Sequence, residues 1–176
     1  MANIKELKKR IKSTKGTLKI TSAMKLVSAA KLSKAQGRIQ AFKPYSSELE
    51  STVRMASSLV ENYSHEYLNE NKEVNKALVL VVSSEKGLCG GYNAQLFKKI
   101  KQKMSKTDEE LEFVFIGKKV QSLLKREMDF EITKYEFEKS DPTFEEVKAI
   151  ANKLAARFTS GEMAKVYVAF NSFIFS

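Results

Sequence analysis

The residues best suited to chemistry in this chain lie in one segment, 83–93, which reads SSEKGLCGGYN. The segment holds three glycines, a lysine and the cysteine Cys89. A glycine-rich loop that joins a strand to a helix can direct backbone N–H groups at a phosphate. This segment lacks G-x-G-x-x-G, and it lacks the P-loop pattern because its lysine precedes the glycines. A tight turn is therefore the favoured interpretation, and a phosphate-binding loop is the alternative.

Histidine and cysteine occur once each, as His65 and Cys89. A single cysteine excludes a disulfide within the chain and a cysteine-based zinc site, and a single histidine argues against a His-coordinated metal or a Ser-His-Asp triad. Cys89 could be an activated thiol near a helix start. No histidine lies near it in sequence, however, which favours a packed, inert side chain. We therefore assign no catalytic residue, no metal and no cofactor.

The elements around this segment follow an alternating pattern. A continuous apolar run at 77–82 is typical of a strand that is buried on both faces. Further strands are predicted at 112–116, 130–135 and 165–170, with helices at 93–104, 118–127 and 143–159. Thr143 or Asp141 is suited to cap the last helix. Such alternation predicts a Rossmann-like three-layer α/β domain with a mostly parallel sheet.

The residues before this domain favour one long helix, from Ala2 to about Leu68. Apolar residues recur there with a seven-residue period, which indicates a left-handed coiled coil; about 67 residues at a rise of 1.5 Å would span roughly 100 Å. We name the a and d positions of this repeat the seam. They are Ile4, Leu7, Ile11, Thr14, Leu18, Thr21, Lys25, Ser28, Leu32, Ala35, Ile39, Phe42, Ser46, Leu49, Val53, Ala56, Val60, Tyr63 and Tyr67. Pro44 predicts a kink in a continuous helix, with a division into two helices as the alternative.

The seam is uneven along its length. Its d positions from Thr14 to Ala35 are small or polar, which lets a partner helix approach closely but buries less apolar surface. In the same stretch, residues such as Ile20, Met24 and Val27 place apolar atoms on other faces. We therefore expect this part of the helix to contact more than one neighbour, and a helix inside a globular core is the alternative.

Positive charge is concentrated at the N-terminal end. Residues 1–43 contain twelve Lys and Arg but one acid, Glu6, which gives +11, whereas the other 133 residues have nineteen bases and twenty acids, which gives −1. This segment predicts an acidic partner: nucleic acid, an anionic membrane surface or an acidic protein. A solvated helix face is the plain alternative.

Length and composition indicate a soluble, ordered chain. The 176 residues are 43% hydrophobic and 30% charged, with two prolines. No apolar stretch approaches the ~20 residues of a membrane span, and we identify no signal peptide. We predict a shaft helix at 1–68, a linker at 69–75 and an α/β domain at 76–176. The end at Phe173–Ser176 falls within an apolar pattern, and we expect a truncated chain there.

Four motifs in order point to a family. They are Ile4–Ile11 (IKELKKRI), Lys19–Leu32 (KITSAMKLVSAAKL), Pro44–Tyr45 and Ser84–Asn93 (SEKGLCGGYN). Together they resemble the γ subunit of the F-type ATP synthase. That family continues with a long C-terminal helix, which would be the antiparallel partner that the seam requires. Without it, we expect this chain to be weakly stable or to aggregate alone.

The resemblance implies a non-catalytic rotor at the cytoplasmic face of the bacterial inner membrane. Its partners would be the α and β subunits, the ε subunit and the c-ring, with no nucleic acid and with catalysis in the β subunits. By resemblance, nine residues would face the α/β hexamer: Lys5, Lys9, Arg10, Lys12, Ile20, Met24, Lys25, Val27 and Lys31. The loop near ε and the c-ring would comprise Lys86, Gly87, Leu88, Cys89, Gly90, Gly91, Tyr92 and Asn93.

Two other functional classes are compatible with parts of the sequence. A nucleic-acid binder would use the basic helix to neutralise phosphates, but the helix carries a continuing apolar seam and no aromatic residue before Phe42. A small-molecule-binding regulator would need acids at the strand ends, and the first strand ends in Val82-Ser83-Ser84. We therefore favour the rotor.

Overall fold

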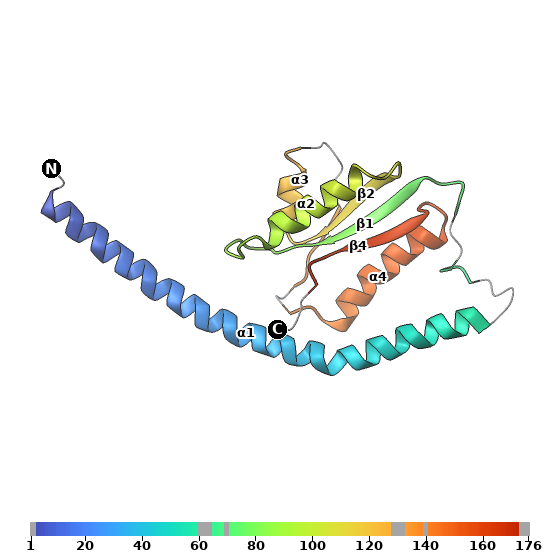
Figure 1. Cartoon of the computed structure of the whole chain (residues 1–176), viewed down its shortest axis with the longest axis horizontal. Helices are drawn as coiled ribbons and strands as arrows, with labels where there is room; N and C mark the ends of the chain where they lie inside the picture. The colour runs from blue at the N-terminus through green and yellow to red at the C-terminus, as the bar shows by residue number, and fades with distance from the viewer. Residues whose placement is uncertain (1–2, 60–64, 69–70, 128–132, 139–140, 173–176) are drawn as a thin grey trace. The chain divides into compact units, whose positions relative to one another are not determined.

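The computed structural model describes residues 3–59, 65–68, 71–127, 133–138 and 141–172. Cα positions divide the chain into two compact units, Met1–Tyr63 and Ser64–Ser176, which we describe separately. The fold class predicted from the sequence is confirmed: a long N-terminal helix and an α/β unit with a parallel sheet (Figure 1).

The first unit is the helix α1, Ile4–Leu59, which is 56 residues long and continuous through Pro44. Asn3 caps its start, because its side-chain Oδ1 accepts a hydrogen bond from the Lys5 backbone N–H at 3.1 Å. Figure 1 shows α1 curving, with a change of direction in its second half, the half that contains Pro44. Proline cannot donate the backbone hydrogen bond of its turn, and its ring pushes the preceding turn away.

The predicted helix does not extend to Leu68. The described helix α1 runs to Leu59, and Glu66–Leu68 form a turn in which the Leu68 N–H donates to the His65 carbonyl oxygen at 2.9 Å. The heptad phase continues to Tyr67, but a seven-residue pattern does not by itself make a helix continue. The seam positions Val60 and Tyr63 lie outside the described residues.

The second unit alternates strands and helices as the sequence predicted. Its elements are β1 (Lys76–Val82), α2 (Tyr92–Met104), β2 (Glu110–Ile116), α3 (Lys119–Leu124), β3 (Thr133–Tyr135), α4 (Phe144–Thr159) and β4 (Lys165–Ala169). The strands form one sheet in the order β3-β2-β1-β4, and every pairing is parallel. β1 is a central strand, and residues 77–81 are all buried, as its unbroken apolar run requires.

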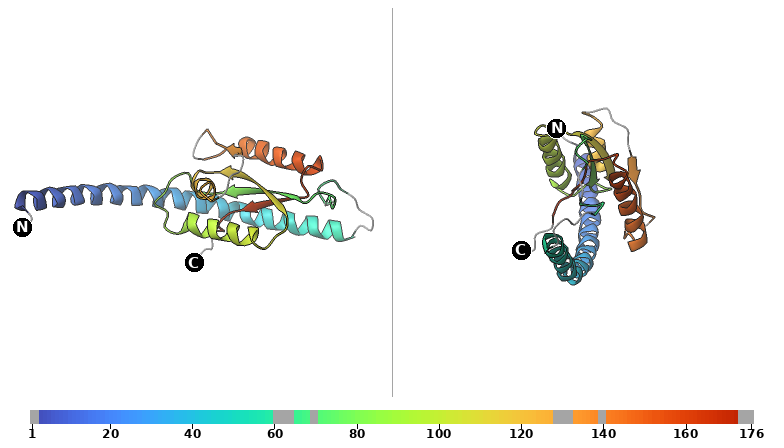
Figure 2. Two further views of the ribbon diagram at one scale, coloured as in Figure 1. Left: turned by 90° about the horizontal axis from the view of Figure 1, so that it is seen from above. Right: turned by 90° about the vertical axis from the view of Figure 1, so that its right-hand side faces the viewer.

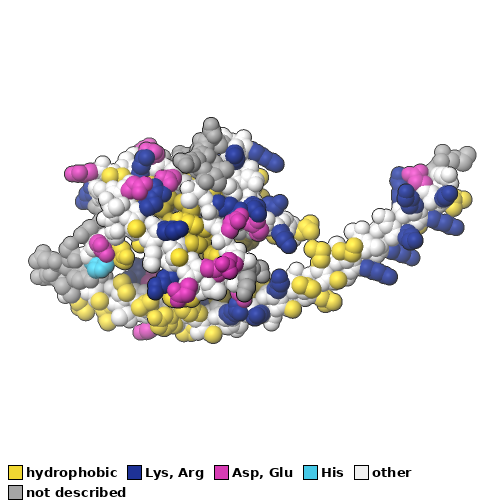
Figure 3. Space-filling view, turned by 180° about the vertical axis from the view of Figure 1, so that it is seen from behind, with side chains coloured by type: hydrophobic (Ala, Val, Ile, Leu, Met, Phe, Trp, Pro, Cys, Tyr) yellow, Lys and Arg dark blue, Asp and Glu magenta, His cyan; other side chains and the backbone are white. Residues whose placement is uncertain are grey.

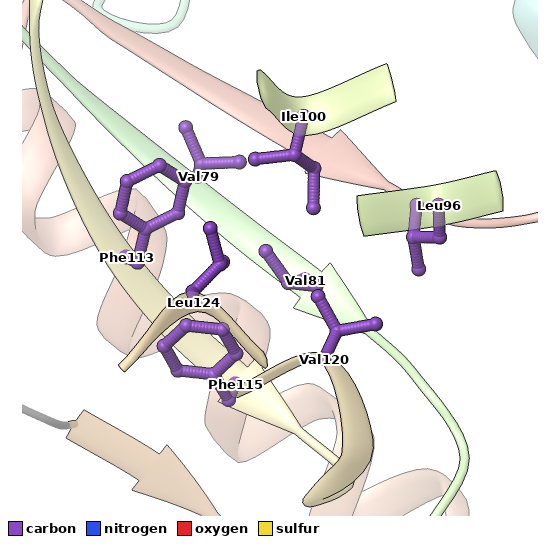
Figure 4. Close-up of a cluster of buried hydrophobic side chains, with 8 residues drawn as sticks. All are labelled: Val79, Val81, Leu96, Ile100, Phe113, Phe115, Val120 and Leu124. Atoms are coloured by element: carbon purple, nitrogen blue, oxygen red, sulfur yellow. The ribbon is translucent and has the colours of Figure 1, made fainter. Parts of the chain in front are cut away.

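The sheet has helices on both faces. On one face, α2 and α3 supply Leu96, Ile100, Val120 and Leu124 to a core with side chains of β1 and β2 (Figure 4). On the other face, Ile150 and Leu154 of α4 pack on Leu78, Leu80 and Val114. Figure 2 shows α4 and α2 on opposite sides of the strands. The three-layer prediction is therefore confirmed.

α4 is fixed at both ends. At its start, the Thr143 hydroxyl accepts from the Glu146 N–H at 3.3 Å and the Glu146 carboxylate accepts from the Thr143 N–H at 2.8 Å, a reciprocal capping box. At its end, the Arg157 guanidinium donates to Glu112 of β2 and to Glu162. These two carboxylates raise the pKa of Arg157, and Arg157 in turn lowers the pKa of Glu162.

Candidate functional site

All nine residues expected to face the α/β hexamer lie on α1, and all nine are exposed. The three apolar ones are only partly covered, with 63% of Ile20, 49% of Met24 and 58% of Val27 accessible. Single exposed apolar side chains are common, but neighbouring ones that form a patch often mark an interaction surface.

Helix geometry gathers most of these nine residues on one side. Successive residues of an α-helix rotate by about 100° around its axis. On that spacing, seven of them fall within an arc of about 120°, which we name the outer stripe. Its members are Lys5, Lys9, Lys12, Ile20, Met24, Val27 and Lys31. Lys25 belongs to the seam instead, and Arg10 lies just beyond the stripe, where its guanidinium pairs with Glu6 at 2.7 Å.

The outer stripe and the seam occupy opposite sides of the N-terminal part of α1. The seam residues Ile4, Leu7, Ile11 and Leu18 centre about 180° from the stripe around the helix axis. They too are exposed, with accessible fractions from 46% to 71%. α1 therefore presents two separate exposed surfaces. One is apolar, and the other carries basic residues followed by apolar ones.

The two threonines of the seam have hydrogen-bonded hydroxyl groups. The Thr14 hydroxyl donates to the Arg10 carbonyl oxygen at 2.9 Å, and the Thr21 hydroxyl donates to the Thr17 carbonyl oxygen at 3.0 Å. With the hydroxyls bound to their own helix, the threonines can face a partner through their methyl groups. A neighbouring helix could cover this part of the seam without stranding a hydroxyl donor.

Figure 3 shows how charge is distributed along α1. Lysine and arginine side chains gather near its N-terminal end, and a stretch with hydrophobic side chains follows before further basic residues. The distribution matches the basic and apolar segments read from the sequence.

The glycine loop follows β1 at the carboxyl edge of the sheet. Inside it, the Asn93 side chain donates to the Ser84 hydroxyl at 2.8 Å and to the Cys89 sulfur at 3.0 Å. The Ser84 N–H donates back to the side-chain oxygen of Asn93 at 3.2 Å. This set joins the two ends of the loop and holds the half-buried Cys89 thiol against the start of α2. The loop is a tight βα turn, as favoured from the sequence.

The tip of the loop has an unusual backbone. Leu88 has a φ of 62°, in the left-handed region that disfavours residues with a Cβ, and 92% of its side chain is accessible. Gly90 has a φ of 56° and accommodates the next reversal without strain. The tip of the loop therefore combines an exposed apolar side chain with a strained backbone.

Sequence reasoning missed Gly117, which seats the glycine loop on the sheet. Gly117 follows β2 with a φ of 87°, and a Cβ there would lie 2.2 Å from the Ser83 carbonyl oxygen. The Ser83 N–H donates to the Ile116 carbonyl oxygen at 2.8 Å. No motif marks this glycine, because its neighbour is 34 positions earlier and becomes adjacent only when β1 pairs with β2.

Charged side chains surround the same edge of the sheet. Lys118 pairs with Glu85 of the loop, and Lys134 pairs with Glu136. Glu85 raises the pKa of Lys118, and Lys134 lowers the pKa of Glu136. Lys118, Glu85 and Glu136 are exposed, and Lys134 is half-buried. Among the described residues, no group of three or more His, Cys, Asp or Glu is placed to bind a metal ion.

An apolar groove lies on the α2 face of the edge strand β4. Its volume is about 290 Å³, and its walls include Leu96, Ile100, Tyr167 and Phe170, with Lys103 at the rim. The Lys103 ammonium lies 4.7 Å from the centre of the Tyr167 ring.

No helix in the described part of the chain has the length and hydropathy of a membrane span.

A family model described as ATP synthase matches residues 3–176. The chain is 37% identical over 176 residues to the ATP synthase gamma chain of Christiangramia forsetii. The chain belongs to the ATP synthase gamma chain family. Other gamma chains are similar, at 34% identity in Flavobacterium psychrophilum and 37% in Flavobacterium johnsoniae, and each match covers 98% of this chain. The chain spans about 60% of the length of these curated gamma chains.

Proposed function

We propose that this chain is part of the central stalk of an F-type ATP synthase and acts as its rotor. In this role it carries torque between a membrane ring of c subunits and a catalytic α/β hexamer, so that ion translocation is coupled to ATP synthesis or hydrolysis. The chain itself performs no chemistry, and the nucleotide sites belong to the β subunits. The observation that carries the proposal is the pair of opposite contact surfaces on α1.

A rotor shaft needs such a division of surfaces. The seam binds a second helix, which stiffens the shaft, while the outer stripe faces the surrounding hexamer. Basic residues at Lys5, Lys9 and Lys12 attract acidic segments of the hexamer, and the apolar residues Ile20, Met24 and Val27 slide against it. A +11 balance in residues 1–43 makes the hexamer-facing side complementary to acidic protein.

The α/β unit is the docking base in this proposal. The glycine loop Lys86–Asn93 faces the ε subunit and the c-ring, with the exposed Leu88 as its apolar contact. The assembly is peripheral, at the cytoplasmic face of the bacterial inner membrane. No nucleic acid takes part.

Co-expression with cognate α and β subunits tests the function. Sizing in 0.3 M salt, with subunit staining, should give one copy of this chain per α/β hexamer. A parallel sample with duplex DNA should give no complex that survives the same salt. Salt-sensitive DNA binding without co-elution would refute the rotor and favour a nucleic-acid arm.

Matched lysine variants locate the surface. Lys5, Lys9 and Lys12 changed together to Gln should weaken co-elution with the hexamer, because they remove three charges from the outer stripe. Lys99, Lys106 and Lys125 are also exposed but belong to the α/β unit, so the same change there is the control. Equal loss in both variants would mean that net charge, and not the stripe, directs binding.

A further inference from the structure

We propose that the apolar groove between α2 and β4 binds a free medium-chain fatty acid, with the carboxylate at Lys99 and the alkyl chain inside the groove. The proposal concerns the α/β unit alone and goes beyond the proposed function, which gives this groove no role. A concave pocket with mostly apolar walls and a few polar groups at its mouth is the usual form of a small-molecule site.

The groove exists because the helices cover the sheet unevenly. α2 and α3 pack over β1 and β2, whereas β4 is an edge strand of the sheet. Tyr167 and Ala169 of β4 pack at the margin of this core and are only half-buried. Beneath them Val79 and Phe113 are 6% and 2% exposed, and Figure 4 shows Ile100 of α2 next to Val79. The buried core therefore supplies an apolar floor.

The walls of the groove suit an alkyl chain. Leu96 and Ile100 of α2 line one side, and Ala169 and Phe170 of β4 line the other. Phe170 is 59% exposed, so an apolar ligand would remove more of its surface from water. A peptide would bring backbone N–H and C=O groups between these walls at a cost, whereas an alkyl chain has no polar group to bury. The groove therefore favours an alkyl chain over an extended peptide.

The volume of the groove sets the length of that chain. A water molecule has a share of about 30 Å³ in the liquid, and a methylene group is of similar size. The groove of about 290 Å³ thus holds roughly ten such groups. Decanoate, the saturated ten-carbon acid, is therefore the ligand to test.

Two lysines of α2 make the rim of the groove basic. Lys99 and Lys103 lie one turn apart, and both line the groove. Lys103 is already engaged, because its ammonium lies 4.7 Å from the centre of the Tyr167 ring and 3.7 Å from a carboxylate oxygen of Glu109. Lys99 is exposed and forms no ion pair with any residue that the structure describes. A carboxylate at the mouth would therefore pair with Lys99.

Isothermal titration calorimetry of the full chain tests the site. Decanoate should bind to one site with a dissociation constant of roughly 0.1–1 mM, as a ligand of about twelve non-hydrogen atoms allows. From hexanoate to decanoate, each added CH₂ should tighten binding by about fourfold, and tetradecanoate should bind no tighter than dodecanoate. Binding that keeps tightening up to hexadecanoate, or that takes several molecules per chain, would mean non-specific adsorption and would overturn the proposal.

Charge reversal at the rim tests the position of the carboxylate. Lys99→Glu should weaken decanoate binding by roughly 3–10-fold and tighten the binding of decylammonium by a similar factor. Lys98→Glu is the matched control, because Lys98 is exposed on the same helix but does not line the groove. Decanol has no charge and should bind both variants alike. Equal losses of decanoate binding in the two variants would contradict the assignment to Lys99.

Filling the groove tests the position of the alkyl chain. Ala169→Leu places a larger side chain in one wall and should weaken decanoate binding by at least ~10-fold, with an unchanged far-UV circular dichroism spectrum. Vesicles of anionic phospholipid test the other source of acyl chains. A chain that binds these vesicles but not monomeric decanoate, or an Ala169→Leu chain that binds decanoate as the parent does, would refute a fatty-acid site in this groove.

Discussion

Substituting Gly117 tests how the glycine loop is held on the sheet. A Cβ at Gly117 would lie 2.2 Å from the Ser83 carbonyl oxygen and 2.7 Å from the Ser83 carbonyl carbon, both backbone atoms that cannot rotate away. The φ of 87° adds strain for any residue with a Cβ. Left-handed backbone costs roughly 1–2 kcal/mol and overpacking about 1–3 kcal/mol, so Gly117→Ala should lower the free energy of unfolding by about 2–5 kcal/mol.

Two other glycines separate the causes. Gly90 has a φ of 56°, but a Cβ added there would meet no atom within 4 Å, so Gly90→Ala should cost only the ~1 kcal/mol of backbone strain. Gly16 lies inside α1 with open space around it, so Gly16→Ala should add helix stability of roughly 0.5–1 kcal/mol and leave the α/β unit unchanged.

Urea unfolding, followed by the near-UV circular dichroism of tyrosine and by far-UV circular dichroism, measures these changes. Such a loss at Gly117 is a large fraction of the 5–15 kcal/mol that is typical of a domain. A Gly117→Ala chain within ~1 kcal/mol of the parent would refute the close approach of β1 and β2 at this edge. A Gly90→Ala chain that loses as much free energy of unfolding as Gly117→Ala would refute it too.

Three further predictions concern the ends of the α/β elements. Thr143→Ala removes the hydroxyl that accepts from the Glu146 N–H, so it should cost about 1 kcal/mol in a urea melt, and Thr143→Ser should recover most of the loss. Arg157→Met leaves Glu112 and Glu162 without their guanidinium partner and should lower the free energy of unfolding by about 1 kcal/mol, since 25% of the arginine side chain is exposed. In 1 M salt the difference in stability between this variant and the parent should be smaller. Hydrogen bonding from Lys165 lowers the pKa of Glu109 below its ordinary 4.5, so the stability that the ionised carboxylate contributes above pH 4.5 should be lost as the pH falls through the lowered pKa. Glu109→Gln should reduce this loss of stability at low pH, and an unchanged pH profile in the variant would count against the pairing.

The sequence pattern predicted most of the α/β unit because its signals are local. The apolar run at 77–82 needs no knowledge of its neighbours to be identified as an inner strand, and Thr143 followed by Glu146 carries its own capping signal. The parallel orientation of the strands also follows from the sequence, since each strand is separated from the next by a helix.

The features that were missed depend on contacts between distant residues. Gly117 meets Ser83 only through the pairing of β1 with β2, and Asn93 reaches Ser84 only because the loop closes on itself. Following the heptad phase extended the predicted helix to about Leu68, whereas Glu66–Leu68 form a turn. A periodic pattern records which residues would share a face if the helix continued, and it does not supply the stability that makes the helix continue.

The two surfaces of α1 explain why composition alone could not identify its partner. A balance of +11 over residues 1–43 fits nucleic acid as well as protein, but a net charge does not say on which side of a helix the basic residues lie. Placing the residues on α1 supplies that direction: Lys5, Lys9 and Lys12 continue into Ile20 and Val27 on one side, while Ile11 and Leu18 lie on the other. A helix bound in a DNA groove would leave apolar residues on both of its sides against phosphates and water, which is unfavourable. A helix held by a second helix on one side and enclosed by protein on the other buries both.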